Sequence, residues 1–250
     1  MHSISPILNI MIKASEKASK TLIRDFGEIE NLQVSAKGPL DFVSNADHRA
    51  EKIIIDELAK SRKNYSIIGE ECGKKINKDK NNIWIIDPID GTTNFLHGVP
   101  HFAISIALKS NDEITAGLIY DPIKDEMFYA EKNNGAFFNN QRIRVSKKHK
   151  LEDCLFTTGG TISEKYKTKN DMIIRRTGSA ALDMAYVAAG RFDGYFQKDL
   201  NIWDIAAGII ILKEAGGIIN KIDLNKLKNI KVLASNASIN DKLLKNLVNF

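Results

Sequence analysis

An apolar run that ends in two closely spaced aspartates constrains the fold of this chain more than any other feature. Residues 83–86, Ile-Trp-Ile-Ile, have the composition of a buried β-strand, and residues 87–93, Asp-Pro-Ile-Asp-Gly-Thr-Thr, follow directly. Because proline cannot donate a hydrogen bond to a sheet, we expect this strand to end at Asp87 and Pro88. The kink at Pro88 would let the carboxylates of Asp87 and Asp90 converge at a strand end that faces a helix start, where α/β proteins build their sites.

The residues after Asp90 favour two different interpretations. Backbone N–H groups at Gly91 and Thr92 would hold an anion at the start of a helix. Alternatively, the residues Asp-Gly-Thr-Thr favour a turn, and the segment would then be an Asx turn with a helix N-cap and no chemical role. The segment alone leaves both interpretations open.

Periodicity elsewhere predicts alternating helices and strands. Apolar residues recur every three or four positions over residues 7–22, which predicts an amphipathic helix, and a second helix is expected from Asp47 to Leu58. Later helices are expected at 179–189 and 203–215, and Ser238 would cap a last helix that has Asp241 three residues on. Strands are expected at 65–68, 102–108, 115–120, 127–130, 155–158, 194–196 and 232–234.

No linker, repeat or low-complexity tract divides the chain. We therefore expect layered sheets and helices of the α/β class in a single domain of residues 1–250. Within it, an N-terminal half of about residues 1–145 would be rich in sheet, and a C-terminal half of about 146–250 would alternate strands and helices.

Charge and cysteine content narrow the functional classes. The chain has 36 Lys and Arg against 31 Asp and Glu, and the basic residues are dispersed, whereas nucleic-acid-binding proteins concentrate them on one stripe or tail. Nucleic acid is therefore not the expected partner. Cys72 and Cys154 lie far apart and form no CxxC pair, which fits a reducing, cytoplasmic location. Residues 1–12 lack the basic start and the cleavage site of a signal peptide, and no membrane span is expected.

Two further acidic positions lie beside apolar elements. Glu70 ends a short strand, and Asp204 opens an apolar helix, which it would alternatively only cap. With Asp87 and Asp90 they predict a shared cavity of oxygen ligands, and such a set favours Mg²⁺ over zinc. Four such carboxylates would not all stay ionised unaided, and about two or three Mg²⁺ ions would neutralise them together with a phosphate monoester.

Two long motifs make the chain resemble the inositol monophosphatase family, which comprises Mg²⁺-dependent, lithium-sensitive sugar phosphatases. The first motif is residues 84–95, Trp-Ile-Ile-Asp-Pro-Ile-Asp-Gly-Thr-Thr-Asn-Phe, and the second is residues 203–208, Trp-Asp-Ile-Ala-Ala-Gly, running on to Glu-Ala-Gly-Gly at 214–217. Residues 41–47, 69–71 and 176–181 support the likeness, and the last of these segments resembles bacterial members. The resemblance covers nearly the whole length and implies a five-layer αβαβα sandwich, paired as a homodimer.

The resemblance also implies a role for each matching residue. Metal ions would be held by Glu70, Asp87, the Ile89 carbonyl, Asp90 and Asp204. Thr92, hydrogen-bonded to Asp47, would with Glu70 orient and deprotonate the attacking water. The substrate would meet Asp90, Gly91, Thr92, Gly178, Ala180 and Gln197. The implied reaction is hydrolysis of inositol-1-phosphate or a related sugar or polyol phosphate by metal-activated water. Trp84 and Trp203 are expected to be packing anchors beside the acids.

Two departures from the family pattern leave the substrate open. The segment between Thr158 and Arg175 is shorter than in typical members, and Gln197 stands where many members carry a glutamate. Gln197 and Lys198 would tolerate a more anionic substrate, such as fructose-1,6-bisphosphate, or the change has no consequence. A non-catalytic role that involves RNA or transcription is the alternative from a different functional class.

Overall fold

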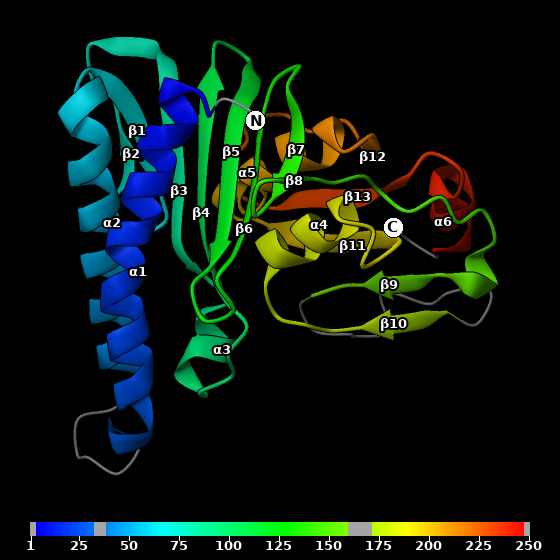
Figure 1. The fold of residues 1–250 in the computed structure, drawn as a ribbon, viewed down its shortest axis with the longest axis horizontal. Coiled ribbons are helices and arrows are strands. Elements are labelled where there is room, and N and C mark those ends of the chain that lie inside the picture. Colours follow the sequence, from blue (N-terminus) through cyan, green and yellow to red (C-terminus); the bar gives the residue numbers. More distant parts are fainter. Residues whose placement is uncertain (1–3, 33–38, 160–171, 248–250) are drawn as a thin grey trace.

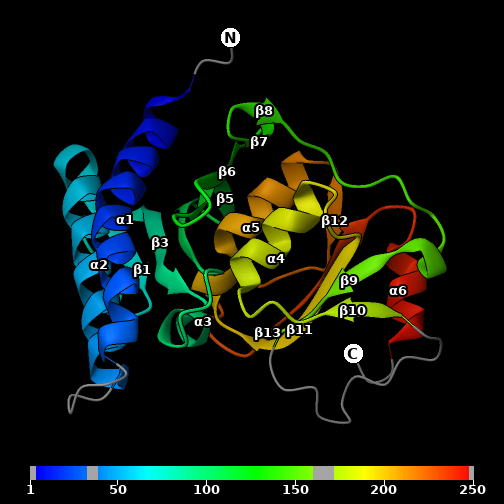
Figure 2. The same ribbon diagram turned by 60° about the horizontal axis from the view of Figure 1, so that its bottom comes forward.

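The computed structural model describes residues 4–32, 39–159 and 172–247, which form five alternating layers of helix and sheet (Figure 1). Helices α1 (Pro6–Leu32) and α2 (Pro39–Arg62) form one outer layer, and the short helix α6 (Asn240–Asn246) lies at the opposite side. Helices α4 (Ala180–Ala188) and α5 (Ile202–Glu214) lie between two sheets, as Figure 2 also shows. This is the αβαβα order that the family resemblance implied.

The large sheet has the strand order β2-β1-β3-β4-β5-β6-β7-β8, in which β1 and β3 are parallel and the other neighbours are antiparallel. Its strands are β1 (Tyr65–Gly69), β2 (Gly73–Lys75), β3 (Asp79–Asp90), β4 (Ala103–Ser110), β5 (Glu113–Asp121), β6 (Glu126–Glu131), β7 (Gly135–Phe138) and β8 (Gln141–Arg142).

The small sheet has the order β10-β9-β11-β13-β12. Its strands are β9 (Leu155–Thr157), β10 (Ile173–Arg175), β11 (Gly194–Leu200), β12 (Gly217–Ile219) and β13 (Ile230–Asn236), and a 3-10 turn (Leu151–Asp153) precedes β9. Most of the segment between Thr158 and Arg175, which is expected to be short, lies outside the described residues.

The sequence pattern explains the two outer helices. Leu8, Met11, Ala14, Ala18 and Leu22 are all buried, and their spacing of three or four residues lines one face of α1, as predicted. Helix α2 begins at Pro39, eight residues before the predicted start at Asp47. Proline is favoured in the first turn because its missing N–H has no helical partner there, so the chain enters the helix earlier than the apolar pattern indicates.

Alternate residues of β3 face different cores. Trp84 and Ile86 pack with α1 and α2, whereas Ile85 belongs to a cluster that includes α4, α5 and buried residues of both sheets. Trp203 lies in that second cluster. Both tryptophans are buried, as expected of packing anchors.

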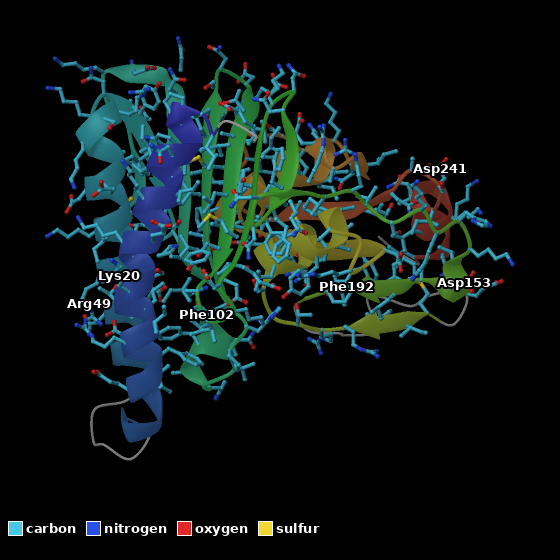
Figure 3. All side chains as sticks on the ribbon, viewed as in Figure 1. Lys20, Arg49, Phe102, Asp153, Phe192 and Asp241 are labelled. Atoms are coloured by element: carbon cyan, nitrogen blue, oxygen red, sulfur yellow. The ribbon has the colours of Figure 1, made fainter. Side chains whose placement is uncertain are left out.

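Three aromatic rings hold the helix that follows the first acidic motif. Helix α3 (Thr92–Leu96) contributes Phe95, whose ring centroid lies 4.9 Å from that of Phe102 in an edge-to-face arrangement. Phe26 of α1 lies 5.3 Å from Phe102, which Figure 3 labels beside α3. Helix α3 is therefore anchored to the outer helix layer through Phe95.

The predicted cap of the last helix is wrong. Helix α6 follows Ile239, and the Asn236 side chain accepts the N–H groups of Ser238 at 2.8 Å and Ile239 at 3.2 Å. An Asx turn just before the helix thus takes over the role expected of Ser238. Among the described residues, no helix has both the length and the apolar run needed to cross a bilayer.

Candidate active site

A bulge in β3 brings the two aspartates of the first motif to one face of the large sheet. Strand β3 does not end at Asp87 and Pro88 as predicted but continues to Asp90. Asp87 pairs with Ser105 and Asp90 with Ala103, so three residue steps on β3 oppose two on β4. Residues three apart on a regular strand point to opposite faces, and the one extra residue places both carboxylates on the same face. Pro88, which lacks an N–H, is tolerated at this bulge.

Four carboxylates from three parts of the chain line one cavity of about 230 Å³. Glu70 follows β1, and its N–H donates to the Ile86 carbonyl at 3.2 Å, which places it beside Asp87. Asp204 lies in the first turn of α5. The described lining residues are Glu70, Asp87, Ile89, Asp90, Gly91, Thr92, Gly159, Gly178, Ser179, Ala180, Gln197, Leu200, Asn201 and Asp204. Every residue that we proposed for the site is among them except Asp47.

Burial raises the pKa of all four acids. It raises the pKa of Glu70 to about 7 and that of Asp90 to about 7, and in both cases the charge of Asp204 adds to the effect. Burial also raises the pKa of Asp204 to about 6. The pKa of Asp87 lies well above its ordinary value because of burial and of the charges of Glu70 and Asp90. Among the described lining residues there is no Lys, Arg or His to compensate these charges.

The start of α4 holds the Asp90 carboxylate. The Ser179 hydroxyl donates to Oδ2, the Ala181 N–H donates to Oδ2 at 2.8 Å and the Ala180 N–H donates to Oδ1 at 3.3 Å. Ser179 also caps α4, because its Oγ accepts the Leu182 N–H at 3.3 Å. The helix N-terminus therefore stabilises the charged form of Asp90 and fixes its orientation.

Asp47 and Thr92 do not form the hydrogen bond that the resemblance implied. The Thr92 hydroxyl donates instead to the Ile89 carbonyl at 3.0 Å. Asp47 lies buried on α2 outside the lining, and its Oδ1 has no hydrogen-bond partner among the described residues. Burial and the charges of Glu70, Glu71 and Glu51 raise the pKa of Asp47 to about 8.

The acids fit a magnesium site in the chemistry of their donors. They supply only oxygen, the ligand that Mg²⁺ prefers, and a divalent cation would neutralise the negative charge that the four acids carry when ionised. Their side chains are nevertheless not arranged as a chelate: among the described residues, no three His, Cys, Asp or Glu could together hold an ion. The oxygens meet protein donors instead, as Asp87 Oδ1 does with the Ile89 N–H at 3.0 Å and Asp204 Oδ2 with the Asn201 N–H at 2.8 Å.

Sequence reasoning missed the residues that join the two sides of the cavity. The Asn94 amide donates to the carbonyls of His101 at 2.7 Å and Thr177 at 2.8 Å. The Thr177 hydroxyl donates to Asp183, which also accepts from Thr157 at 2.8 Å. Thr177 precedes Gly178 and Ser179, so these contacts set where α4 begins. Asn94 lies inside the first motif, which is the one signal that could have identified it.

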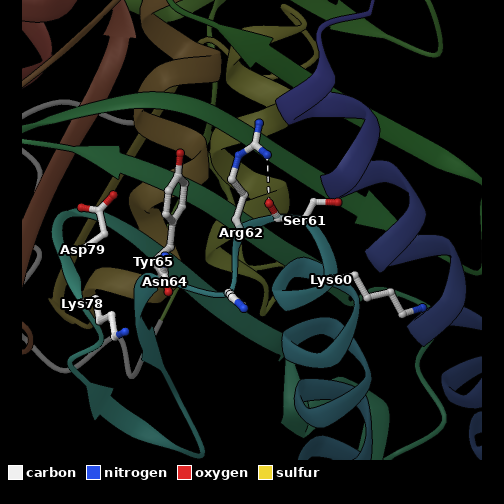
Figure 4. Close-up of a pocket in the computed structure, with 8 residues that line it drawn as sticks. Lys60, Ser61, Arg62, Asn64, Tyr65, Lys78 and Asp79 are labelled. Atoms are coloured by element: carbon white, nitrogen blue, oxygen red, sulfur yellow. Dashed lines mark hydrogen bonds between the residues drawn. The ribbon is translucent and has the colours of Figure 1, made fainter.

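A second and larger cavity lies at the opposite end of the parallel strands (Figure 4). Its volume is about 630 Å³, and it lies where α2 ends and where β1 and β3 begin. It is lined by Lys60, Ser61, Arg62, Lys63, Asn64, Tyr65, Lys78 and Asp79. Its four cations and single carboxylate make it basic, whereas the cavity at the strand ends is acidic.

Comparisons with known proteins identify the family of this chain. The profile described as the inositol monophosphatase family matches residues 3–250. The chain is 46% identical over 254 residues to an inositol-1-monophosphatase of Mesorhizobium japonicum, which covers 96% of each protein. It is 41% identical over 227 residues to a protein named Nus factor SuhB of Pasteurella multocida, which covers 86% of this chain and 85% of that protein.

A solved structure shares the fold. The crystal structure of the extragenic suppressor protein suhB from Bartonella henselae superposes with a TM-score of 0.87 at 45% identity and covers 97% of this chain and 99% of the other. The family profile, the relatives and the fold agree over nearly the whole length, and we conclude that this chain belongs to the inositol monophosphatase family.

Proposed function

We propose that this chain is a Mg²⁺-dependent phosphomonoesterase that releases phosphate from inositol-1-phosphate or a related sugar or polyol phosphate. Its family membership supports a phosphatase. The observation that carries the proposal is the convergence of Glu70, Asp87, Asp90 and Asp204 on one cavity with no cationic side chain among its described lining residues. Such a cavity attracts divalent cations, and these in turn allow a phosphate ester to enter.

Each residue of the cavity has a proposed role. Two or three ions would be held by Glu70, Asp87, the Ile89 carbonyl, Asp90 and Asp204. The contribution of the bound ions is a water of lowered pKa and positive charge beside the phosphate oxygens. Gly91 and Thr92 would bind the phosphate through their N–H groups, and Thr92 and Asp47 would help to orient the attacking water.

The protein's own hydrogen bonds would position the reacting groups. Ser179, Ala180 and Ala181 donate hydrogen bonds to Asp90, and the Asn201 N–H donates to Asp204, so the protein restricts the movement of both carboxylates. The start of α4, with Gly178 and Ala180, would face the alcohol half of the substrate, and Gln197 would face the same half from β11. Catalysis would then depend mainly on positioning and electrostatics.

Replacement of Asp90 by asparagine tests the proposal. The amide carries no charge, and its NH₂ group would meet the donors of α4, so we expect Mg²⁺-dependent phosphate release from inositol-1-phosphate to fall at least about 100-fold. Asp241→Asn on the exposed surface of α6 is the matched control and should keep normal rates. Near-normal rates in Asp90→Asn at saturating Mg²⁺ would refute the assignment.

A binding role in transcription is the second candidate. Relatives at about 40% identity carry the name Nus factor SuhB, and the basic cavity of Figure 4 offers Lys60, Arg62, Lys63 and Lys78 to a polyanion. We would then expect affinity for single-stranded RNA to fall steeply with salt and to weaken in Lys63→Glu. Salt-independent or unaltered binding would exclude this role.

A further inference from the structure

The side-chain amide of Gln197 is held in one orientation by its own strand. Tyr195 and Gln197 are two positions apart on β11 and therefore point to the same face of the small sheet. The Tyr195 hydroxyl donates to Oε1 of Gln197 at 2.8 Å. Because Tyr195 is fully buried, packing fixes the position of this hydroxyl.

The missing side chain of Gly159 leaves room for the same carbonyl. A Cβ atom built on Gly159 would lie 2.1 Å from Oε1 of Gln197 and 2.8 Å from its Cδ. The amide carbonyl thus occupies the space that any other residue at position 159 would fill. Tyr195 and Gly159 together confine the oxygen end of the amide.

A bulge in β11 brings Leu200 to the same face of the small sheet as Gln197. Gln197 pairs with Val232 and Leu200 with Ile230, so three residue steps on β11 oppose two on β13. The extra residue places Gln197 and Leu200 on one face, and both line the acidic cavity. The orientation of the amide therefore matters to whatever enters that cavity.

We infer that Gln197 presents a hydrogen-bond donor to the substrate, and that the site selects phosphate esters with a second anionic group at the position that reaches β11. Oε1 is occupied by Tyr195, and Nε2 forms no hydrogen bond to another described residue, so Nε2 is the group that meets a ligand. An ionised phosphate or carboxylate only accepts hydrogen bonds and therefore matches this donor. A substrate hydroxyl both donates and accepts, so it is not selected by a group that only donates. This inference rests on the proposed phosphatase function.

Charge points to the same class of substrate. The cavity already holds four carboxylates, and the neutral amide adds no fifth charge beside the alcohol half of the substrate. A carboxylate at position 197 would repel a second phosphate. Gln197→Glu changes one charged group at nearly constant shape and isolates this effect.

The experiment compares fructose-1-phosphate with fructose-1,6-bisphosphate, which differ only by hydroxyl or phosphate at one carbon. In the presence of Mg²⁺ we expect the native chain to use the bisphosphate at least as well as the monophosphate. Gln197→Glu should lower the ratio of kcat/KM for the bisphosphate to kcat/KM for the monophosphate about 10-fold. Tyr195→Phe frees the amide to rotate and should lower the same ratio severalfold. Gln141→Glu, an identical substitution on the exposed strand β8, should leave the ratio unchanged.

The outcomes separate this inference from the proposed function. Turnover of both sugars with the same ratio in the native chain and in Gln197→Glu overturns the inference and leaves the phosphatase intact. If neither sugar nor inositol-1-phosphate releases phosphate, the proposed function fails. In that case the affinity ratio of the two sugars, measured by calorimetry on the same proteins, decides the inference, and an unchanged ratio in Gln197→Glu overturns it.

Discussion

The four acids of the cavity show how far individual residues can be predicted from sequence. The motif spacing identified Glu70, Asp87, Asp90 and Asp204, and the structure brings them together. The resemblance did not give the Ile89 carbonyl as a partner of Thr92, and it did not reveal the roles of Tyr195 or Asn94. The contacts of Thr92 and Tyr195 are local, within three residues along the chain, whereas Asn94 meets Thr177 only in the folded molecule. Acidic clusters carry a chemical signal in the sequence, whereas single amide or hydroxyl contacts do not.

At the residue scale, the raised pKa values predict how stability depends on pH and Mg²⁺. Glu70, Asp90 and Asp204 have pKa values of about 7, about 7 and about 6 in the folded chain, above those of ordinary carboxyls. The protonated acids contribute to the stability of the folded chain. This contribution is fully present below the pKa values of the unfolded chain and is lost as the pH rises through the pKa values of the folded chain. We expect the melting temperature of the metal-free chain to fall between about pH 4.5 and about pH 7.5. Added Mg²⁺ should raise the melting temperature more at about pH 7.5 than at about pH 4.5.

Thermal shift assays with and without Mg²⁺ across this range check the prediction. Asp90→Asn and Asp204→Asn should each flatten the pH dependence, because one titrating group is removed in each. Asp241→Asn, outside the cavity, should keep the native slope. A Mg²⁺-induced rise in melting temperature that is equal at both ends of the pH range, or larger at the acidic end, would contradict the assignment.

At the scale of elements, local sequence signals gave the strands and helices more accurately than their ends. The apolar runs placed β3, α4 and α5, but β3 continues past Pro88 because a bulge accommodates the missing N–H. Helix α2 begins before its apolar pattern does, and α6 is capped by the Asn236 turn rather than by Ser238. These differences arise from tertiary contacts and from turn chemistry, which a periodic pattern does not encode.

Asn94 is predicted to act as a positioning residue between α3 and the turn before α4. Its amide donates to the carbonyls of His101 and Thr177, and a carboxylate at this place would repel both. We expect Asn94→Asp to lower kcat about 10- to 100-fold with a smaller change in KM, because the start of α4 moves relative to Asp90. Steady-state kinetics measure this split, and Asn81→Asp on the exposed surface is the control. A lower melting temperature with an unchanged kcat in Asn94→Asp would show that Asn94 has only a structural role.

Helix α5 packs directly on the large sheet at Gly117, and we predict that this contact tolerates no side chain. A Cβ atom there would lie 2.6 Å from Cγ2 of Ile210 and 2.8 Å from the carbonyl oxygen of Ala207. Gly117→Ala should therefore lower the free energy of unfolding by about 1–3 kcal/mol. Gly27→Ala on α1, where nothing lies within 4 Å, should instead raise it by up to about 1 kcal/mol. Urea titrations of both variants measure the difference, and equal effects would contradict the packing argument.

At the scale of the whole molecule, the continuous core links the two sheets. One cluster includes residues of the large sheet, of α4 and α5, and of the small sheet, while Trp84 lies in the neighbouring cluster under α1 and α2. The single-domain hypothesis, with halves of about 1–145 and 146–250, stays a prediction, as does the homodimer. The halves would share one folding transition because each covers apolar surface of the other.

The two tryptophans make this testable. Trp84 and Trp203 lie in different core clusters, so Trp84→Phe and Trp203→Phe leave one fluorescent reporter in each. We expect the urea midpoint seen by fluorescence in each variant to coincide with its own midpoint by circular dichroism. Separate transitions in either variant would show that the halves unfold independently.

The one-residue bulges in β3 and β11 have a consequence for folding. If either strand slipped by one position against its neighbour, the side chains would exchange faces, and the acids or the amide would turn away from the helix layer between the sheets. A slipped chain could still bury much of its apolar surface, yet it would present no complete site. A ligand that binds only the complete site would shift the population toward the correctly aligned strands by mass action. Ligand binding would thus favour the strand register on which the site depends.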